Sequence, residues 1–259
     1  MRILISNDDG IHAEGIRALA EAVHSLGEVV VVAPDVQRSA SSHGITLFQR
    51  LYVEEVQLGI PGATAYSVSG TPVDCVKWAV AQLGQQRPFD LVLSGINEGQ
   101  NLATDVLYSG TLAAAGEGAL HGVPAVAFSL TGPPFPYADA AAAARRIVDA
   151  VLSVPFPPDT FLSVNFPAKD IASAPWRVVP LGARSYQDIF AQRTDESGRV
   201  YYRYTGEALD ENAASETDVH AVNEGAISIT PLTYRFTNEA MIATLKMTLG
   251  THSDGRVNS

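Results

Sequence analysis

The chain has 259 residues, 46% of them hydrophobic, and a formal net charge of -11 at pH 7. A chain of this length can bury about 70–75% of the surface that it exposes when unfolded, which is enough for one large α/β domain. The acidic balance argues against a broad interface with nucleic acid, because such an interface needs clustered lysines and arginines. We therefore expect any phosphorylated ligand to be small.

Signals for export, membrane insertion and zinc binding are weak. Cys75 is the one cysteine, so the chain can form no internal disulfide. The apolar run that follows Met1 and Arg2 is too short for a signal-peptide core, and no apolar run approaches the roughly 20 residues of a membrane span. The histidines lack H-E-x-x-H or C-x-x-C partners. We expect a soluble cytoplasmic protein without a membrane partner.

The predicted elements alternate between strand and helix. Residues 3–6 and the valine run at 28–33 have the continuous apolar character of strands buried in a parallel sheet, and residues 16–24 repeat apolar side chains at helical spacing. Further helices are predicted at 72–83, 111–121 and 138–151, and further strands at 90–94, 124–130 and 161–166. This alternation predicts a doubly wound, mostly parallel, Rossmann-like α/β sheet.

The character of the sequence changes after Pro175. Residues 199–205 are rich in Arg, Tyr and Thr, which predicts a protruding β-hairpin arm. An isolated hairpin is marginal in water, so we expect this arm to pack on a partner chain. A last strand is predicted at 226–230, a closing helix at 238–249 and a polar tail at 251–259.

The stretch I-L-I-S-N-D-D-G, residues 3–10, is the most informative part of the chain, because a buried strand ends there on two carboxylates. Like charges about 4 Å apart at an effective dielectric of about 20 repel by roughly 4 kcal/mol, so Asp8 and Asp9 need a positive partner if they face one point. Gly10 permits the turn that would bring them together. A divalent cation is the simplest partner, whereas a turn with a helix cap is the ordinary alternative.

Other polar residues follow the predicted strands, where ligands bind in open α/β sheets. Carboxylate, hydroxyl and amide oxygens together suit a hard cation such as Mg²⁺ or Mn²⁺. Taken singly, the aspartates and Ser39 are more typical of a turn, loop or cap, whereas for Asn97 and Asn101 a loop role and a ligand role are about equally good interpretations. The candidates at these positions are Asn7, Asp8, Asp9, Ser39, Asn97 and Asn101.

Two helix starts and one histidine are ambiguous. The segment Y-S-G-T precedes the helix predicted at 111–121, so Ser109, Gly110 and Thr111 either hold a phosphate with free N–H groups or simply cap the helix. The segment S-G-T-P at 69–72 raises the same two possibilities, and we favour capping there. His12 follows the acidic turn without a partner that can be named, and we interpret it as a structural or surface histidine.

Several chemistries lose support because their motifs are missing. The chain has no G-x-S-x-G elbow, no G-x-x-x-x-G-K-[ST] loop and no G-x-G-x-x-G after the first strand. Four spaced motifs instead occur in the order of one known family: N-D-D-G at 7–10, A-P-D-x-x-R-S-A at 33–40, S-G-I-N-x-G-x-N at 94–101 and Y-S-G-T at 108–111. The chain resembles the SurE family of metal-dependent 5'/3'-nucleotidases from residue 1 to about 249.

The resemblance implies a site, a reaction and an assembly. It implies one single SurE-like α/β domain over 1–259, with the nucleotidase core and its metal site in 1–130 and a C-terminal oligomerisation arm and helix in 176–249. Family members hydrolyse nucleoside monophosphates, sometimes short polyphosphate, and form homodimers or homotetramers through C-terminal segments. Ala226 departs from the aromatic residue that the family often carries there. The implied ligands of one Mg²⁺ or Mn²⁺ ion are Asp8, Asp9, Ser39 and Asn97, and the implied phosphate-binding residues are Asn101, Ser109, Gly110 and Thr111.

The expected catalytic residues are Asp8 and Asp9, either of which would orient or deprotonate the attacking water. A rival phosphatase mechanism makes one of them a covalent nucleophile, although that chemistry usually pairs aspartates separated by one residue. A rival from another class is a non-catalytic, metal-dependent nucleotide-binding protein. Release of phosphate from nucleotides separates the enzyme from the binder.

Overall fold

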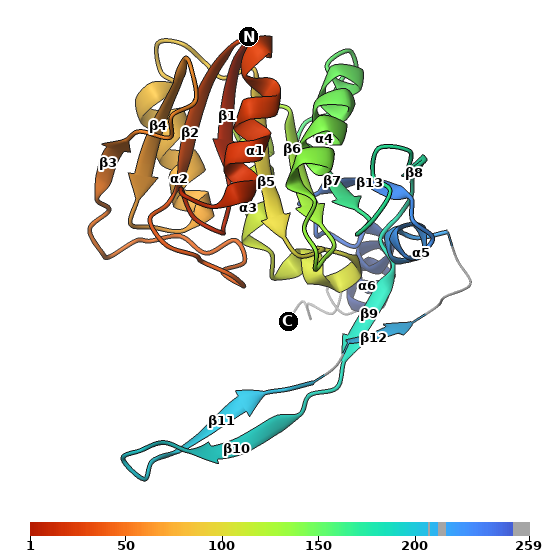
Figure 1. Ribbon diagram of the computed structural model, residues 1–259. Coiled ribbons are helices and arrows are strands. Elements are labelled where there is room, and N and C mark those ends of the chain that lie inside the picture. Colours follow the sequence, from red (N-terminus) through yellow and green to blue (C-terminus); the bar gives the residue numbers. More distant parts are fainter. Residues whose placement is uncertain (207, 212–215, 251–259) are drawn as a thin grey trace, which may run out of the picture.

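A mixed sheet of nine strands forms the centre of the computed structural model, which describes residues 1–206, 208–211 and 216–250. The strand order is β3-β4-β2-β1-β5-β6-β7-β13-β8 (Figure 1). Most neighbours are parallel, while β3 and β13 run antiparallel to β4 and β7. The predicted doubly wound, mostly parallel sheet is confirmed. The strands are β1 (Arg2–Ser6), β2 (Glu28–Pro34), β3 (Val53–Val56), β4 (Ala63–Val68), β5 (Leu91–Glu98), β6 (Ala125–Leu130), β7 (Thr160–Phe166), β8 (Trp176–Val178) and β13 (Ile227–Thr233).

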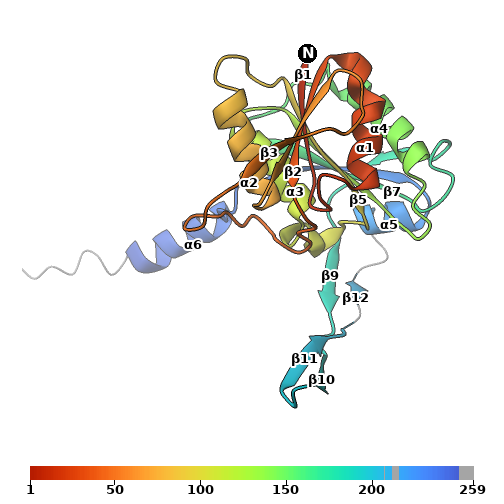
Figure 2. The same ribbon diagram turned by 60° about the vertical axis from the view of Figure 1, so that its left-hand side comes forward.

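Helices cover both faces of the sheet, so the central strands are buried on both sides. Helices α1 (Glu14–Val23) and α4 (Tyr137–Val151) pack together on one face, and α2 (Pro72–Trp78) and α3 (Gly110–Leu120) on the other (Figure 2). The side chains of β1 alternate between the two cores: Ile3 and Ile5 lie in the first and Leu4 in the second. Burial on both faces explains why the strand sequences are continuously apolar.

The remaining helical elements are short, apart from the last helix. Helix α2 continues as a π-helical turn, and its start is a capping box in which Thr71 and Asp74 exchange side-chain and backbone bonds. The capping interpretation of residues 69–72 is thus confirmed. The other elements are η1 (His24–Leu26), η2 (Ala79–Leu83), η3 (Ala103–Leu107), α5 (Asp218–Asn223) and α6 (Glu239–Gly250).

The structure adds elements that the sequence pattern does not predict. Strands β3 and β4 extend the sheet beyond β2, although their sequences carry no continuous apolar run. Strand β5 continues to Glu98, past the predicted end at Ser94, because its polar second half still pairs with β6 after a register shift between Ser94 and Asn97. In both places backbone pairing with a neighbour, rather than side-chain pattern, decides the conformation.

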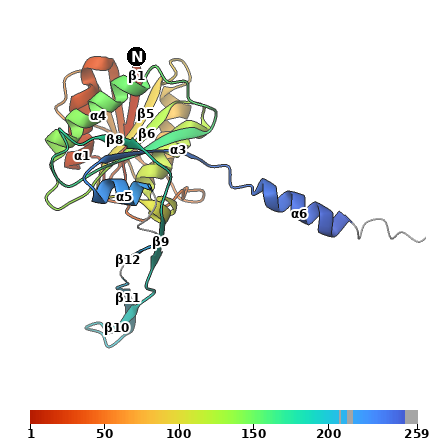
Figure 3. The ribbon, with the colours of Figure 1, turned by 90° about the vertical axis from the view of Figure 1, so that its right-hand side faces the viewer.

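The predicted arm is present and projects from the sheet (Figures 1 and 3). Strands β10 (Phe190–Thr194) and β11 (Val200–Tyr204) form its outer hairpin, and β9 (Ala183–Tyr186) pairs with β12 (Ala208–Glu211) at its base. Helix α6 confirms the predicted closing helix and also extends away from the body (Figures 2 and 3). The predicted tail at 251–259 lies outside the described residues. Among the helices of the described part, none is long and apolar enough to cross a membrane.

Candidate active site

One pocket of about 280 Å³ opens at the carboxyl edge of the parallel strands. Its lining comes from segments far apart in the sequence: the turn after β1, the loop after β2, the end of β5 with the residues that follow, and the start of α3. Neighbouring parallel strands end at the same edge, which is why these loops meet. Of the predicted site residues, those that line the pocket are Asp8, Ser39, Asn97, Asn101 and Ser109.

The acidic turn is built by Asn7 and Gly10. The side-chain amide of Asn7 donates to the carbonyl of Gly10 and accepts from its N–H, and Gly10 has a φ of +104° that favours glycine. This turn lets both aspartates approach the sheet edge. Asn7 therefore shapes the turn.

Asp8 is held at the bottom of the site by α3. Its carboxylate accepts a short hydrogen bond from the Thr111 hydroxyl, and Gly110 lies so close that a Cβ there would meet the Cβ of Asp8 at 2.8 Å. Burial raises the pKa of Asp8 to about 6; the Thr111 hydrogen bond opposes this rise and the charge of Asp9 adds to it. Thr111 and Gly110 thus contact Asp8, although neither is among the pocket-lining residues.

Asp9 lies beside the end of β5. Its carboxylate accepts from the backbone N–H of Glu98 at 3.0 Å and from the Gln37 amide at 3.4 Å. Burial raises the pKa of Asp9, and the charge of Glu98 acts in the same direction while its N–H opposes it. The Asp9 carboxylate therefore lies against the backbone of the residue that follows Asn97, but Asp9 is not among the residues that line the pocket.

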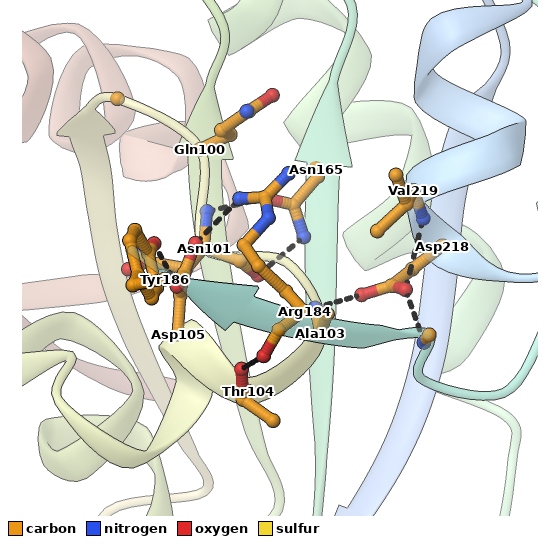
Figure 4. Close-up of polar contacts among 12 residues, drawn as sticks. Gln100, Asn101, Ala103, Thr104, Asp105, Asn165, Arg184, Tyr186, Asp218 and Val219 are labelled. Carbon is orange, nitrogen blue, oxygen red and sulfur yellow. Dashed lines mark hydrogen bonds and ion pairs between the residues drawn. The ribbon is translucent and has the colours of Figure 1, made fainter. Parts of the chain in front are cut away.

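The two asparagines are fixed by different partners. The Asn97 side-chain nitrogen donates to the carbonyl of Gly99 at 2.8 Å, which leaves its amide oxygen as the candidate ligand atom. Asn101 donates from its side chain to the Ser129 hydroxyl at 2.9 Å, and its backbone exchanges hydrogen bonds with the Asn165 side chain (Figure 4). Ser129 and Asn165 hold Asn101 in place, and nothing in their local sequence points to the site.

Ser109 and Ser39 come from different segments, the start of α3 and the loop after β2. Ser109 caps α3, accepting from the N–H of Leu112 at 3.2 Å, so the capping possibility is confirmed. Ser109 also lines the pocket, and its phosphate-binding role stays a prediction. The loop carrying Ser39 is tied to the acidic turn because the N–H of Arg38 donates to the carbonyl of Asp8 at 2.7 Å. His12 is exposed, as expected for a surface histidine.

The residues present fit a hard divalent cation. Among the described residues no lysine or arginine forms an ion pair with Asp8 or Asp9, although both are adjacent and at least partly buried. No group of three or more His, Cys, Asp or Glu side chains gathers in the described part at metal-binding spacing, which disfavours a zinc centre. Two carboxylates with hydroxyl and amide oxygens nearby suit Mg²⁺ or Mn²⁺.

Some pocket residues were missed by the sequence reasoning. Tyr186 comes from β9 at the base of the arm, and Asp105 and Tyr108 come from η3 and the residue after it. Tyr108 belongs to the Y-S-G-T motif, so its proximity to Ser109 could have been used. Tyr186 carries no such signal, because only the folded arm brings it to the pocket.

The fold and the site define an α/β protein with an oxygen-rich ligand pocket at the carboxyl edge of its parallel strands. The family model described as Survival protein SurE matches residues 3–188. The chain belongs to the SurE family.

Relatives match over nearly the whole length. The chain is 47% identical over 254 residues to a 5'-nucleotidase SurE from Heliobacterium modesticaldum, covering 96% of this chain and 92% of the relative. A 5'-nucleotidase SurE from Trichormus variabilis is 45% identical over 252 residues, covering 92% of this chain and 94% of the relative. The crystal structure of the SurE protein from Aquifex aeolicus superimposes with a TM-score of 0.82 at 36% identity, covering 96% of this chain and 99% of that one.

Ala226, the residue that departs from the family pattern, is buried in a small cluster with Val179 and Ala221.

Proposed function

We propose that this protein is a 5'-nucleotidase, a metal-dependent phosphatase that hydrolyses nucleoside 5'- and 3'-monophosphates, with short polyphosphate as a further substrate. The observation that carries the proposal is that three separate segments bring their polar side chains to the same pocket. These side chains are Asp8, Asn97 and Ser109. Relatives that carry the name 5'-nucleotidase SurE at 45–47% identity support the reaction class.

Four side chains would hold the cation: Asp8, Asp9, Ser39 and Asn97. When bound, a divalent cation supplies Lewis-acid stabilisation of charge on the phosphoryl oxygens, an effect worth several kcal/mol. The Thr111 hydroxyl and the packing of Gly110 keep the Asp8 carboxylate in one position for this role.

The chain's own groups would bind the phosphate and handle the proton. The phosphate would bind beside Ser109 and Asn101, which line the pocket, near the N-terminus of α3, whose free N–H groups and partial positive charge favour an anion. Asp8 or Asp9 would orient a water for attack on phosphorus and accept its proton. As the P–O ester bond breaks, the leaving ester oxygen takes up a proton from that carboxyl group or from solvent. In the metal-free protein burial raises the pKa of Asp8 to about 6, and a bound cation would lower it.

The test is a phosphate-release assay over nucleoside 5'- and 3'-monophosphates and short polyphosphate with Mg²⁺, Mn²⁺ or chelator. We expect phosphate release from the nucleotides that stops with chelator and returns when metal is added back. Tight nucleotide binding without phosphate release would instead identify a binding protein. Rapid quenching that traps a phosphorylated aspartate would identify the covalent mechanism.

We further propose that the protein assembles as a homodimer or homotetramer through the arm and α6. The arm exposes apolar and aromatic side chains, including Phe190 at 60% exposure and Tyr202 at 61%. Helix α6 projects from the body and exposes Met241, Ile242, Leu245, Met247 and Leu249. A helix with this much exposed apolar surface is expected to pack against another chain.

Light scattering after size-exclusion chromatography tests the assembly. Replacing both Ile242 and Leu245 with glutamate should lower the measured mass to that of a smaller species, because each glutamate would be buried in the interface. Lys246→Glu, an added glutamate at a charged position of the same helix, serves as the control. A parent protein that elutes as a monomer would contradict the proposal.

A further inference from the structure

Two tyrosines stand at the pocket beyond the metal-binding and phosphate-binding residues. Tyr108 directly precedes Ser109, and Tyr186 is the last residue of β9; both line the pocket. The Tyr108 side chain is 59% exposed, and neither ring packs against another aromatic ring among the described residues. Both residues line the pocket, so a flat ligand group that extends out of the phosphate site would meet them.

Tyr186 is held in place by a polar cluster at the base of the arm. The Tyr186 hydroxyl donates a short hydrogen bond to one carboxylate oxygen of Asp105, and Arg184 Nη1 contacts the other at 2.6 Å (Figure 4). The Arg184 and Asp105 side chains are 6% and 16% exposed, so the pair is well shielded from solvent. The backbone carbonyl of Arg184 also accepts from the Thr104 hydroxyl. Asp105 thus holds the Tyr186 hydroxyl, and Arg184 in turn holds Asp105.

The cluster further favours the neutral form of the Tyr186 phenol. Burial raises the pKa of Tyr186 to about 12, and the hydrogen bond to Asp105 and the charge of that carboxylate act in the same direction. A neutral ring avoids repulsion from the nearby acidic residues and from the phosphate of a ligand.

The side chains that line the pocket offer few other contacts for the leaving group of a phosphate ester. No lysine or arginine is among the described residues that line it, and its charged members are the carboxylates of Asp8, Glu98 and Asp105. A ligand part that is neutral, flat and aromatic suits such a lining best. Aromatic side chains stack on nucleobases of every kind, with about 1–3 kcal/mol per base.

We propose that Tyr108 and Tyr186 form the nucleobase subsite of this enzyme and make it selective for nucleotides over phosphate esters that lack a base. This inference rests on the proposed nucleotidase function and names the residues that recognise the nucleoside part. Asp105 is a positioning residue, because it acts through the Tyr186 ring.

The experiment compares AMP with ribose 5-phosphate, which shares the sugar and phosphate but lacks the base. In Tyr186→Ala and in Tyr108→Ala, we expect kcat/KM for AMP to fall about 10-fold or more, the size of one lost stacking contact. For ribose 5-phosphate the same ratio should stay within about threefold of the parent. Tyr186→Phe keeps the ring but loses the hydrogen bond to Asp105, so its kcat/KM for AMP should lie between those of the parent and Tyr186→Ala.

Binding of adenosine alone supplies a second readout that needs no turnover. Calorimetry should show adenosine binding to the parent protein and binding about 10-fold weaker in both alanine variants. Tyr52→Ala serves as the control, because Tyr52 is 61% exposed and lies outside this pocket. If Tyr186→Ala fails to fold, Tyr108→Ala decides the question at an exposed position.

The two proposals fail in different ways. A parent that releases no phosphate from either ester would overturn the nucleotidase function, while the adenosine measurement would still judge the subsite. A parent that is active, with alanine variants that lose AMP and ribose 5-phosphate activity equally or lose neither, would overturn the subsite and leave the nucleotidase standing.

Discussion

Asp8→Asn is expected to reduce phosphate release about 10³-fold or more while leaving the fold intact, a loss of the size seen when a catalytic group is removed. Asparagine matches the shape of the aspartate but lacks the charge that holds a cation and the basicity that accepts a proton. The Thr111 hydroxyl can still donate to the amide oxygen of the variant. The measurement is kcat with saturating Mn²⁺, with circular dichroism to confirm the fold.

The same substitution should stabilise the metal-free protein. Because burial raises the pKa of Asp8 from 3.8 to about 6, the folded wild type loses stability as the pH rises through this range, where the unfolded chain has already released the proton. Above pH 7 the free energy of unfolding of Asp8→Asn should exceed that of the wild type by about 3 kcal/mol, and below pH 3.8 this difference should vanish. Denaturant unfolding at pH 8, 6 and 4 in the presence of a chelator measures this difference in the free energy of unfolding.

Asp149→Asn is the control, since that residue lies on α4 and pairs with Arg145 at the surface. It should leave kcat unchanged, and its effect on stability should be small. An Asp8→Asn variant that keeps activity within tenfold of the parent would contradict the catalytic role. A stability difference that does not depend on pH would contradict the effect of burial.

Gly110→Ala is expected to lower kcat about 100-fold, because it displaces Asp8. A Cβ at this position would lie 2.8 Å from the Cβ of Asp8, 3.0 Å from its carboxylate and 2.7 Å from the Ser41 hydroxyl oxygen. Contacts shorter than about 3 Å force the neighbours apart, and a misplacement of about 1 Å can cost a factor of about 10² in rate. Alanine favours the helix by up to about 1 kcal/mol, which offsets part of the strain.

Gly118→Ala provides a matched comparison on the same helix. Its added Cβ would meet Val92 Cγ2 at 2.7 Å, in the core and away from the pocket. That variant should lose stability and keep kcat, whereas Gly110→Ala should lose kcat with a smaller effect on stability. Equal loss of activity in both variants would mean that general destabilisation, rather than displacement of Asp8, is responsible. Thermal unfolding and steady-state kinetics on the two proteins decide this.

The sequence predicted the central part of the fold from its pattern. Strands β1 and β2 are covered on both faces, so their residues had to be continuously apolar, and the pattern could be recognised without coordinates. The amphipathic α1 and the capped α2 were predicted for similar local reasons. Strands β3 and β4 lie toward the sheet edge with partly exposed, mixed side chains, so no local pattern identified them.

The residues of the candidate site also fall into two groups: those that the sequence identified and those that only the structure brought to the site. The acidic turn, Ser39, Asn97 and the Y-S-G-T segment could be selected because each follows a strand or starts a helix, and parallel strand ends converge. The sequence could not identify three other residues, because each contacts the pocket or its supporting residues from a segment at least 28 residues away. These residues are Asn165, Ser129 and Tyr186.

The sequence by itself determined the alternation of the central strands and helices, the acidic turn and the oxygen-rich character of the ligand set, because periodicity, turn chemistry and residue type are local properties. Only the tertiary structure decided that Gly110 packs against Asp8, that Asn165 holds Asn101, and that the base of the arm brings Tyr186 to the pocket. These are contacts between distant segments, and their geometry depends on how the whole sheet and its covering helices pack.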